Sequence, residues 1–285
     1  MIREQSEAIA GRLPPLQVRA ERAAQTVWQG MHGRRRPGRG EAFWQFRHYE
    51  SFDDSRRIDW RCSARGRDVY VRETEWEAAQ SVWIWCDASP SMRYRSRRDV
   101  PEKIDRAGVL AVALAILLVE GGENVAPLGE GMPARGGRSG LNIFIETLLA
   151  SSAKTSRPPL EPLPQYAQVV LISDFLESAE TYRELIAEFA TSGCGGHCLQ
   201  VLDPSEESFP YGGRIQFEGT EEETPRLLRR AESLREIYQD RLAEHRATLK
   251  ELTSTADWNF ATHGTDSSPE TALLPLFTTM TRSAI

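Results

Sequence analysis

Along most of the chain, short apolar runs alternate with longer stretches in which apolar positions recur every three or four residues. The short runs are mostly continuous and rich in β-branched or aromatic side chains, which is typical of strands buried on both faces of a sheet. These runs are SVWIWCD (81–87), NVAPLG (124–129), QVVLISD (168–174), HCLQVLD (197–203) and DWNFATH (257–263). The longer stretches predict helices over 102–122, 141–152, 179–193 and 270–280.

Strands that alternate with helices of this length form βαβ crossovers. The sequence therefore predicts an α/β fold over residues 81–285, with a mostly parallel, Rossmann-like sheet covered by helices on both faces. A long charged segment, residues 224–252, has apolar residues at helical spacing and a proline near its start. It predicts one amphipathic helix that lies on the domain, and a partner-binding helix is the alternative.

Two smaller segments precede this domain. Residues 1–40 combine a loose helical periodicity with the run GMHGRRRPGRG, and so predict a helix followed by an arginine-rich linker. Residues 41–80 contain two strand-like runs, FWQFRHY (43–49) and DVYVRETEW (68–76). We expect them to form a small β-rich arm.

Composition narrows the class of protein. The net charge of −6 argues against a general polyanion binder, although residues 34–72 hold eleven arginines and six acidic residues. The chain has 32 arginines and three lysines. We attribute this excess to the base composition of the genome, and functional selection for arginine is the alternative. No run reaches the roughly 20 apolar residues of a membrane span, and the N-terminus lacks a signal-peptide core. With only four cysteines, we expect a cytoplasmic protein without disulfides.

Two of the predicted strands end in aspartate, Asp87 and Asp174. Because parallel strands point their carboxyl ends at one edge of a sheet, both carboxylates should meet there. The loop after Asp87 adds the hydroxyls of Ser89 and Ser91. Hard oxygen ligands of this kind suit Mg²⁺, or Mn²⁺ in its place. The alternative is that these residues only cap a helix or form a turn.

DASPSM (87–92) resembles the D-x-S-x-S of the metal-ion-dependent adhesion site in von Willebrand factor A domains, and LISDFLES (171–178) resembles its later aspartate loop. The segment RHYESFDDSRRIDWRCSARGRDVYVRETEWE (47–77) is similar to the signature of the bacterial domain of unknown function 58 family, in which such a segment precedes a domain of this type. The resemblance extends from about residue 38 to residue 285.

This resemblance implies a von Willebrand factor A fold and a protein-interaction module rather than an enzyme. Members of the family are commonly encoded beside MoxR-type AAA+ ATPases, so it implies such an ATPase and a client protein as partners, in chaperone-like maturation or assembly. Adhesion-site domains usually supply a threonine from a loop between the two aspartates. ARGGRSGLNIF (134–144) has none, and Ser139 is the nearest hydroxyl candidate for that metal-ligand position.

The signature segment also carries charges interleaved with an aromatic residue. Read physically, it predicts a salt-bridged, tryptophan-anchored connection between the arm and the domain, or a docking surface. RNA binding through arginines and aromatics is a third reading, which no recognised motif supports. The residues of the segment expected to form this connection or docking surface are Arg47, Asp54, Arg57, Asp59, Trp60 and Arg65.

Other chemistry is disfavoured by what the sequence lacks. CGGHC (194–198) has no second cluster to complete a zinc site, and no G-x-x-x-x-G-K-[ST] is present for nucleotide hydrolysis. A phosphatase-type nucleophile at Asp87 would need a carboxylate where Ser89 stands. A metal-dependent hydrolase that uses Asp87 and Asp174 remains the main alternative to a binding module.

Overall fold

The computed structural model describes residues 16–28, 43–49, 58, 60–64, 68–74, 79–150, 156–217 and 226–282. They fall into two compact units: Met31–Ala79 is one, and the remainder of the chain is the other.

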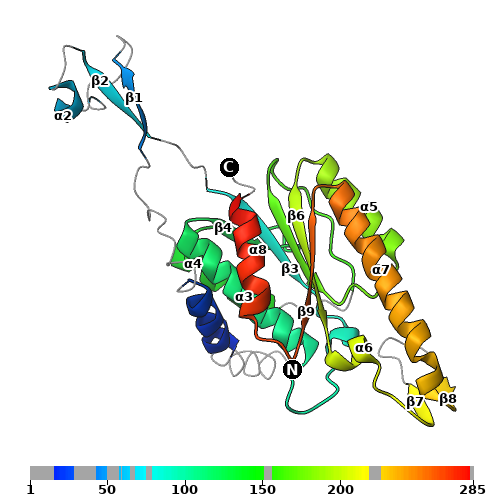
Figure 1. Ribbon diagram of the computed structural model, residues 1–285. Helices are drawn as coiled ribbons and strands as arrows, with labels where there is room; N and C mark the ends of the chain where they lie inside the picture. Colours follow the sequence, from blue (N-terminus) through cyan, green and yellow to red (C-terminus); the bar gives the residue numbers. More distant parts are fainter. Residues whose placement is uncertain are drawn as a thin grey trace. The chain divides into compact units, whose positions relative to one another are not determined.

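The larger unit is built on a five-stranded sheet in which every neighbouring pair of strands is parallel (Figure 1). In spatial order the strands are β4 (Asn124–Pro127), β3 (Ser81–Cys86), β5 (Gln168–Ser173), β6 (Gly195–Leu202) and β9 (Asn259–Gly264). The predicted α/β fold with a Rossmann-like parallel sheet is confirmed. Four of the strands run through the core as continuous buried segments, as their apolar sequences indicate, whereas the edge strand β9 is largely exposed.

Helices cover the sheet on both faces. Side chains alternate along each strand, so Trp83 and Trp85 of β3 face one layer while Val82 and Ile84 face the other. The tryptophans belong to an aromatic core with side chains of α5 and α7, whereas α3 packs beside α4 and α8. These helices are α3 (Lys103–Gly121), α4 (Gly137–Ala150), α5 (Ala179–Thr191), α7 (Arg235–Thr255) and α8 (Glu270–Arg282).

Helix α3 is the most deeply buried helix of the described chain. Nearly all its residues from Ala107 to Val119 are inaccessible, and Gly122 ends it in a left-handed conformation with φ of 99°. A further helix at residues 16–28 packs against α3, since a Cβ on Gly108 would lie 3.1 Å from the Leu16 side chain. The predicted division had placed this helix with the linker, apart from the domain. Among the described residues, no helix is long and apolar enough to span a lipid bilayer.

The smaller unit contains the predicted β-rich arm. Its strands β1 (Phe43–His48) and β2 (Tyr70–Thr74) pair antiparallel, and a single helical turn, α2 (Trp60–Ser63), lies between them in sequence. The backbone N–H of Tyr70 donates to the Ser63 hydroxyl at 2.9 Å, which ties α2 to the second strand.

The prediction of one helix over 224–252 was wrong at its start. Residues Arg226–Leu228 form strand β8, which pairs antiparallel with β7 (Ile215–Phe217). A 3₁₀ turn follows over Ala231–Leu234, and α7 begins only at Arg235. Helical spacing of apolar residues could not reveal this, because a three-residue strand is defined by its pairing with β7 and not by a pattern of its own.

Buried histidines should make the fold acid-sensitive. Burial lowers the pKa of His197, in β6, to about 4, and burial with help from Arg106 does the same for His263 in β9. As the pH falls from about 6.5, the unfolded chain binds these protons first, so folding loses about 1.4 kcal/mol per pH unit per histidine until about pH 4.

We therefore expect His197→Leu to reduce the loss of unfolding free energy between pH 6.5 and 4, by about half of what the two histidines contribute together. Urea unfolding at a series of pH values measures it, and the two proteins should show parallel pH dependence above pH 7. If the unfolding free energy of the two proteins changed equally with pH between 6.5 and 4, the lowered pKa of His197 would be contradicted.

Candidate functional site

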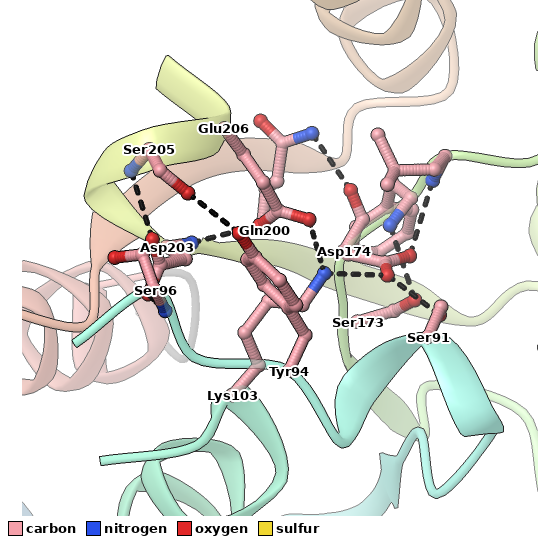
Figure 2. A network of polar contacts seen from close by, with 12 residues as sticks. Ser91, Tyr94, Ser96, Lys103, Ser173, Asp174, Gln200, Asp203, Ser205 and Glu206 are labelled. Carbon is pink, nitrogen blue, oxygen red and sulfur yellow. Dashed lines mark hydrogen bonds and ion pairs between the residues drawn. The ribbon is translucent and has the colours of Figure 1, made fainter. Parts of the chain in front are cut away.

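Three neighbouring strands of the sheet end in aspartate. Asp87 follows β3, Asp174 follows β5 and Asp203 follows β6, and these strands are adjacent in the order β3–β5–β6. All three residues are almost completely buried. A polar network therefore gathers at the carboxyl edge of the sheet, where open α/β folds place their ligands (Figure 2).

Asp87 organises the serine loop. Its Oδ1 accepts the backbone N–H of Ser89 at 2.8 Å, and its Oδ2 accepts the Ser173 hydroxyl at 2.6 Å. Ser89 then leads into a 3₁₀ turn that Pro90 begins, and the hydroxyls of Ser89 and Ser91 lie 3.1 Å apart. Burial raises the pKa of Asp87, although these hydrogen bonds oppose the rise and the nearby Asp174 adds to it.

Asp174 joins the two loops. The Ser91 hydroxyl donates to Asp174 Oδ2 at 2.7 Å, and Asp174 Oδ1 accepts the backbone N–H of Leu176 at 3.2 Å. Phe175 between them has φ of 52°, an uncommon conformation for a residue with a side chain. It turns the chain sharply, so the Asp174 carboxylate stays at the edge while the Phe175 ring enters the core.

Helix α7 holds the Asp174 loop by its backbone. His245 Nε2 donates to the Phe175 carbonyl at 2.6 Å. Gln200 donates to the Asp174 carbonyl at 2.8 Å, and Arg246 Nε in turn donates to Gln200 at 2.7 Å. Two consecutive carbonyls of the loop are thus bound by side chains from α7 and β6, which fixes the carboxylate in place.

Lys103, the first residue of α3, brings a fully buried positive charge to the site. Its Nζ donates to Asp174 Oδ2 at 3.0 Å and to Glu206 Oε1 at 2.7 Å, as Figure 2 shows. Burial by itself lowers the pKa of Lys103, but the two carboxylates outweigh it and raise that pKa above its usual value. Burial raises the pKa of Glu206, and the ammonium only partly offsets this.

Asp203 has a different role. It caps the short helix α6 (Pro204–Ser208) in a reciprocal capping box with Glu206, and its Oδ2 accepts the backbone N–H of Ser96 at 2.9 Å. Burial opposes ionisation, but the donors from Ser96 and Ser205 outweigh it and lower the pKa of Asp203. Asp203 therefore connects the loop after β3 to α6, with its own charge satisfied by hydrogen bonds.

The donor set fits a divalent cation of the Mg²⁺ class. Two hydroxyls and the carboxylates of Asp87 and Asp174 are hard oxygen donors that lie within one hydrogen-bonded cluster. If all are ionised, Asp87, Asp174 and Glu206 exceed the single charge of Lys103 by two negative charges. The raised pKa of Asp87 and of Glu206 shows that burial makes this excess unfavourable, and a divalent cation would cancel it.

The structure brings four of the predicted metal ligands together, namely Asp87, Ser89, Ser91 and Asp174. Ser139 is not among them. It lies exposed in the first turn of α4, and the described hydrogen bonds of the cluster do not include it. The expectation that Ser139 replaces the family's threonine is therefore not supported.

The signature residues are only partly described. Asp54, Arg57, Asp59 and Arg65 lie outside the described residues, as does the side chain of Arg47, although its backbone belongs to β1. Trp60 begins α2 with 67% of its surface exposed, so it is not packed inside its own unit. Cys194 and Cys198 are buried free thiols, and no group of three or more metal-ligating His, Cys, Asp or Glu side chains occurs in the described part.

Sequence reasoning missed several members of the network, among them the charged residues Lys103, Asp203 and Glu206. Two of these three could have been identified from the sequence. Lys103 is one of three lysines in a chain that uses arginine almost everywhere else, and Asp203 ends a predicted strand in the same way as Asp87 and Asp174. Glu206 has no comparable signal, because only the fold brings α6 to the first turn of α3.

Comparisons with known proteins place the chain in a sequence family. The sequence profile of the family described as "Protein of unknown function DUF58" matches residues 45–248. Uncharacterized proteins of Mycobacterium tuberculosis (Rv1480) and Mycobacterium bovis (Mb1516) are each 28% identical over 260 residues, which covers 85% of this chain and 80% of theirs.

Two solved structures from Bacteroides are also similar, and each is matched over its full length by 72% of this chain. One is an aerotolerance-related membrane protein of Bacteroides fragilis, with a TM-score of 0.44 and 17% identity. The other is the conserved hypothetical protein BatB of Bacteroides thetaiotaomicron, with a TM-score of 0.43 and 16% identity.

Asp87 and Asp203 should respond in opposite ways to neutralisation. The pKa of Asp87 is raised in the folded state, so its ionisation weakens folding above that pKa, and Asp87→Asn should stabilise the metal-free protein at pH 7. The pKa of Asp203 is lowered, so its charge stabilises folding above the usual pKa of an aspartate, and Asp203→Asn should destabilise it.

Thermal unfolding at pH 7 with a chelator present should show changes of about 2–4 °C, up for Asp87→Asn and down for Asp203→Asn. The difference for Asp87→Asn should shrink as the pH falls toward 4, and the difference for Asp203→Asn should shrink below pH 4. If both variants changed the unfolding temperature in the same direction at pH 7, the opposite pKa shifts of Asp87 and Asp203 would be contradicted.

Proposed function

We propose that this chain, which belongs to the DUF58 family, is a non-enzymatic protein-interaction module that binds partners through a Mg²⁺ or Mn²⁺ ion held by Asp87, Ser89, Ser91 and Asp174. The main support is the serine pair. Its two hydroxyls lie 3.1 Å apart, and Ser91 bonds Asp174 at 2.7 Å across the edge between β3 and β5. This is the oxygen set that the resemblance to an adhesion site implies.

The chain's own residues would preorganise the ion's surroundings. Asp87 holds the serine loop through the N–H of Ser89, and His245 with Gln200 holds the Asp174 loop through its carbonyls. Ser91 is only half-buried, which leaves the outer side of the cluster accessible to a partner. A bound Mg²⁺ supplies an open coordination position for a carboxylate of another protein.

A MoxR-type AAA+ ATPase and a client protein are the proposed partners, on the family resemblance. The work of assembly or maturation would come from ATP hydrolysis by the ATPase, because this chain carries no phosphate-binding loop motif.

Ser91→Ala tests the metal site directly. Loss of this hydroxyl should weaken Mg²⁺ and Mn²⁺ binding by about 10- to 100-fold, the usual effect of removing a group that orients or contacts a bound metal. Titration calorimetry on the full chain measures it. Ser139→Ala is the matched control, and we expect wild-type affinity from it because Ser139 lies exposed on α4.

The same proteins then decide between binding and turnover. Retention of the ATPase in a pull-down should require Mg²⁺, and both EDTA and Ser91→Ala should abolish it. Hydrolysis of a phosphate ester that requires Mg²⁺ and is lost in Asp87→Asn would establish the hydrolase instead. Absence of metal binding by the folded wild-type protein, alone or with the ATPase, would remove the proposed mechanism.

A further inference from the structure

Lys103 occupies a position that the proposed metal-binding role does not explain. An ammonium group with no solvent exposure is costly to bury, and it persists only when its partners compensate. Here the partners are Asp174, one of the proposed metal ligands, and Glu206. In the described part of the chain, Lys103 is the single basic side chain bonded to Asp87, Asp174 or Glu206.

The Asp174 Oδ2 atom is shared. It accepts from Ser91 at 2.7 Å and from Lys103 at 3.0 Å, so the oxygen that faces the serine pair already has a cation beside it. A divalent ion bound by the serines and this oxygen would stand next to the ammonium. The ion and the ammonium would then be neighbouring positive charges, and neighbouring cations in a buried environment repel each other strongly.

The ammonium has a second anchor. Lys103 Nζ lies 2.7 Å from Glu206, closer than it lies to Asp174, and Glu206 is held in turn by the backbone N–H of Asp203 at 2.8 Å. Lys103 could therefore leave Asp174 without losing all compensation for its charge.

We infer that Lys103 and a divalent cation are alternative counter-ions of Asp174, so that Lys103 is the residue that sets the metal affinity of the site. The inference rests on the proposed metal-binding function. Without metal, the lysine neutralises Asp174 and keeps the site folded. When metal binds, the ammonium moves off Asp174 and remains on Glu206 alone.

This exchange connects the metal to a second surface. Glu206 belongs to α6, and the loop that leads to Lys103 is tied to the same region by Ser96 on Asp203 and by Tyr94, whose hydroxyl lies 3.0 Å from that of Ser205. A shift of Lys103 toward Glu206 alters the contact between the first turn of α3 and α6. The metal-loaded protein thereby presents a partner with a different 94–103 loop.

The chain offers a direct observation of this exchange, because it has only three lysines, Lys103, Lys154 and Lys250. In protein labelled with ¹³C-lysine, we expect the ε-methylene signal of Lys103 to shift during Mg²⁺ titration and to saturate together with the calorimetric isotherm. The signal is assigned by its absence from Lys103→Met. The signal of Lys250, which is exposed on α7, should stay unchanged.

Affinity supplies the second readout. Lys103→Met keeps the length of the side chain without its charge, and it should bind Mg²⁺ at least about tenfold more tightly than the wild type. It should also unfold at a lower temperature without metal and regain stability when Mg²⁺ is added. Lys250→Met, the same change at an exposed site, should match the wild type in both respects.

The outcomes separate this inference from the proposed function. Mg²⁺ binding by the wild type with an unmoved Lys103 signal and a Lys103→Met affinity within twofold would overturn the exchange and leave the metal site standing. Binding by Lys103→Met alone would support the inference and remove the metal-bridging function of the wild type. No binding by either folded protein would overturn both. If Lys103→Met fails to fold, the wild-type Lys103 signal, assigned by elimination with Lys154→Met and Lys250→Met, decides.

Discussion

The site depends on one constraint: carboxylates that parallel strands bring to the same edge of the sheet are buried there and need compensation. Asp87 is compensated by a backbone N–H and a hydroxyl, Asp203 by backbone N–H groups, and Asp174 by a hydroxyl and the ammonium of Lys103. The local structure follows from these needs. The serine loop turns back on Asp87, α3 begins with a lysine at the edge, and α6 is capped by an aspartate.

Rigid and adjustable parts are separated within this arrangement. Backbone contacts from His245 and Gln200 hold the Asp174 loop, and the left-handed Phe175 anchors it in the aromatic core. These contacts involve carbonyls and leave the carboxylate of Asp174 to its ionic partners. The ammonium of Lys103 lies at the end of a long side chain between two acceptors, so it is the component that can move when charge is added.

Much of the fold could be predicted from the chain, because apolar runs of strand length alternate with helical periodicity and each is a local property. The same logic located Asp87 and Asp174, since a strand's last residue is readable from sequence. Lys103 and Glu206 were missed because their pairing depends on how α3 and α6 pack, which no local pattern records. Ser139 shows the converse case. Its type fits a metal ligand, but α4 presents it to solvent, outside the described hydrogen-bonded cluster.

The most direct test of the central claim is an anomalous difference map from crystals of the full chain grown with Mn²⁺. The account predicts a manganese peak beside the hydroxyls of Ser89 and Ser91 and the carboxylate of Asp174, with Lys103 Nζ bonded to Glu206 alone. A map without such a peak, while Lys103 remains on Asp174, would contradict the metal site. A peak at the serines with Lys103 still bonded to Asp174 would contradict the exchange.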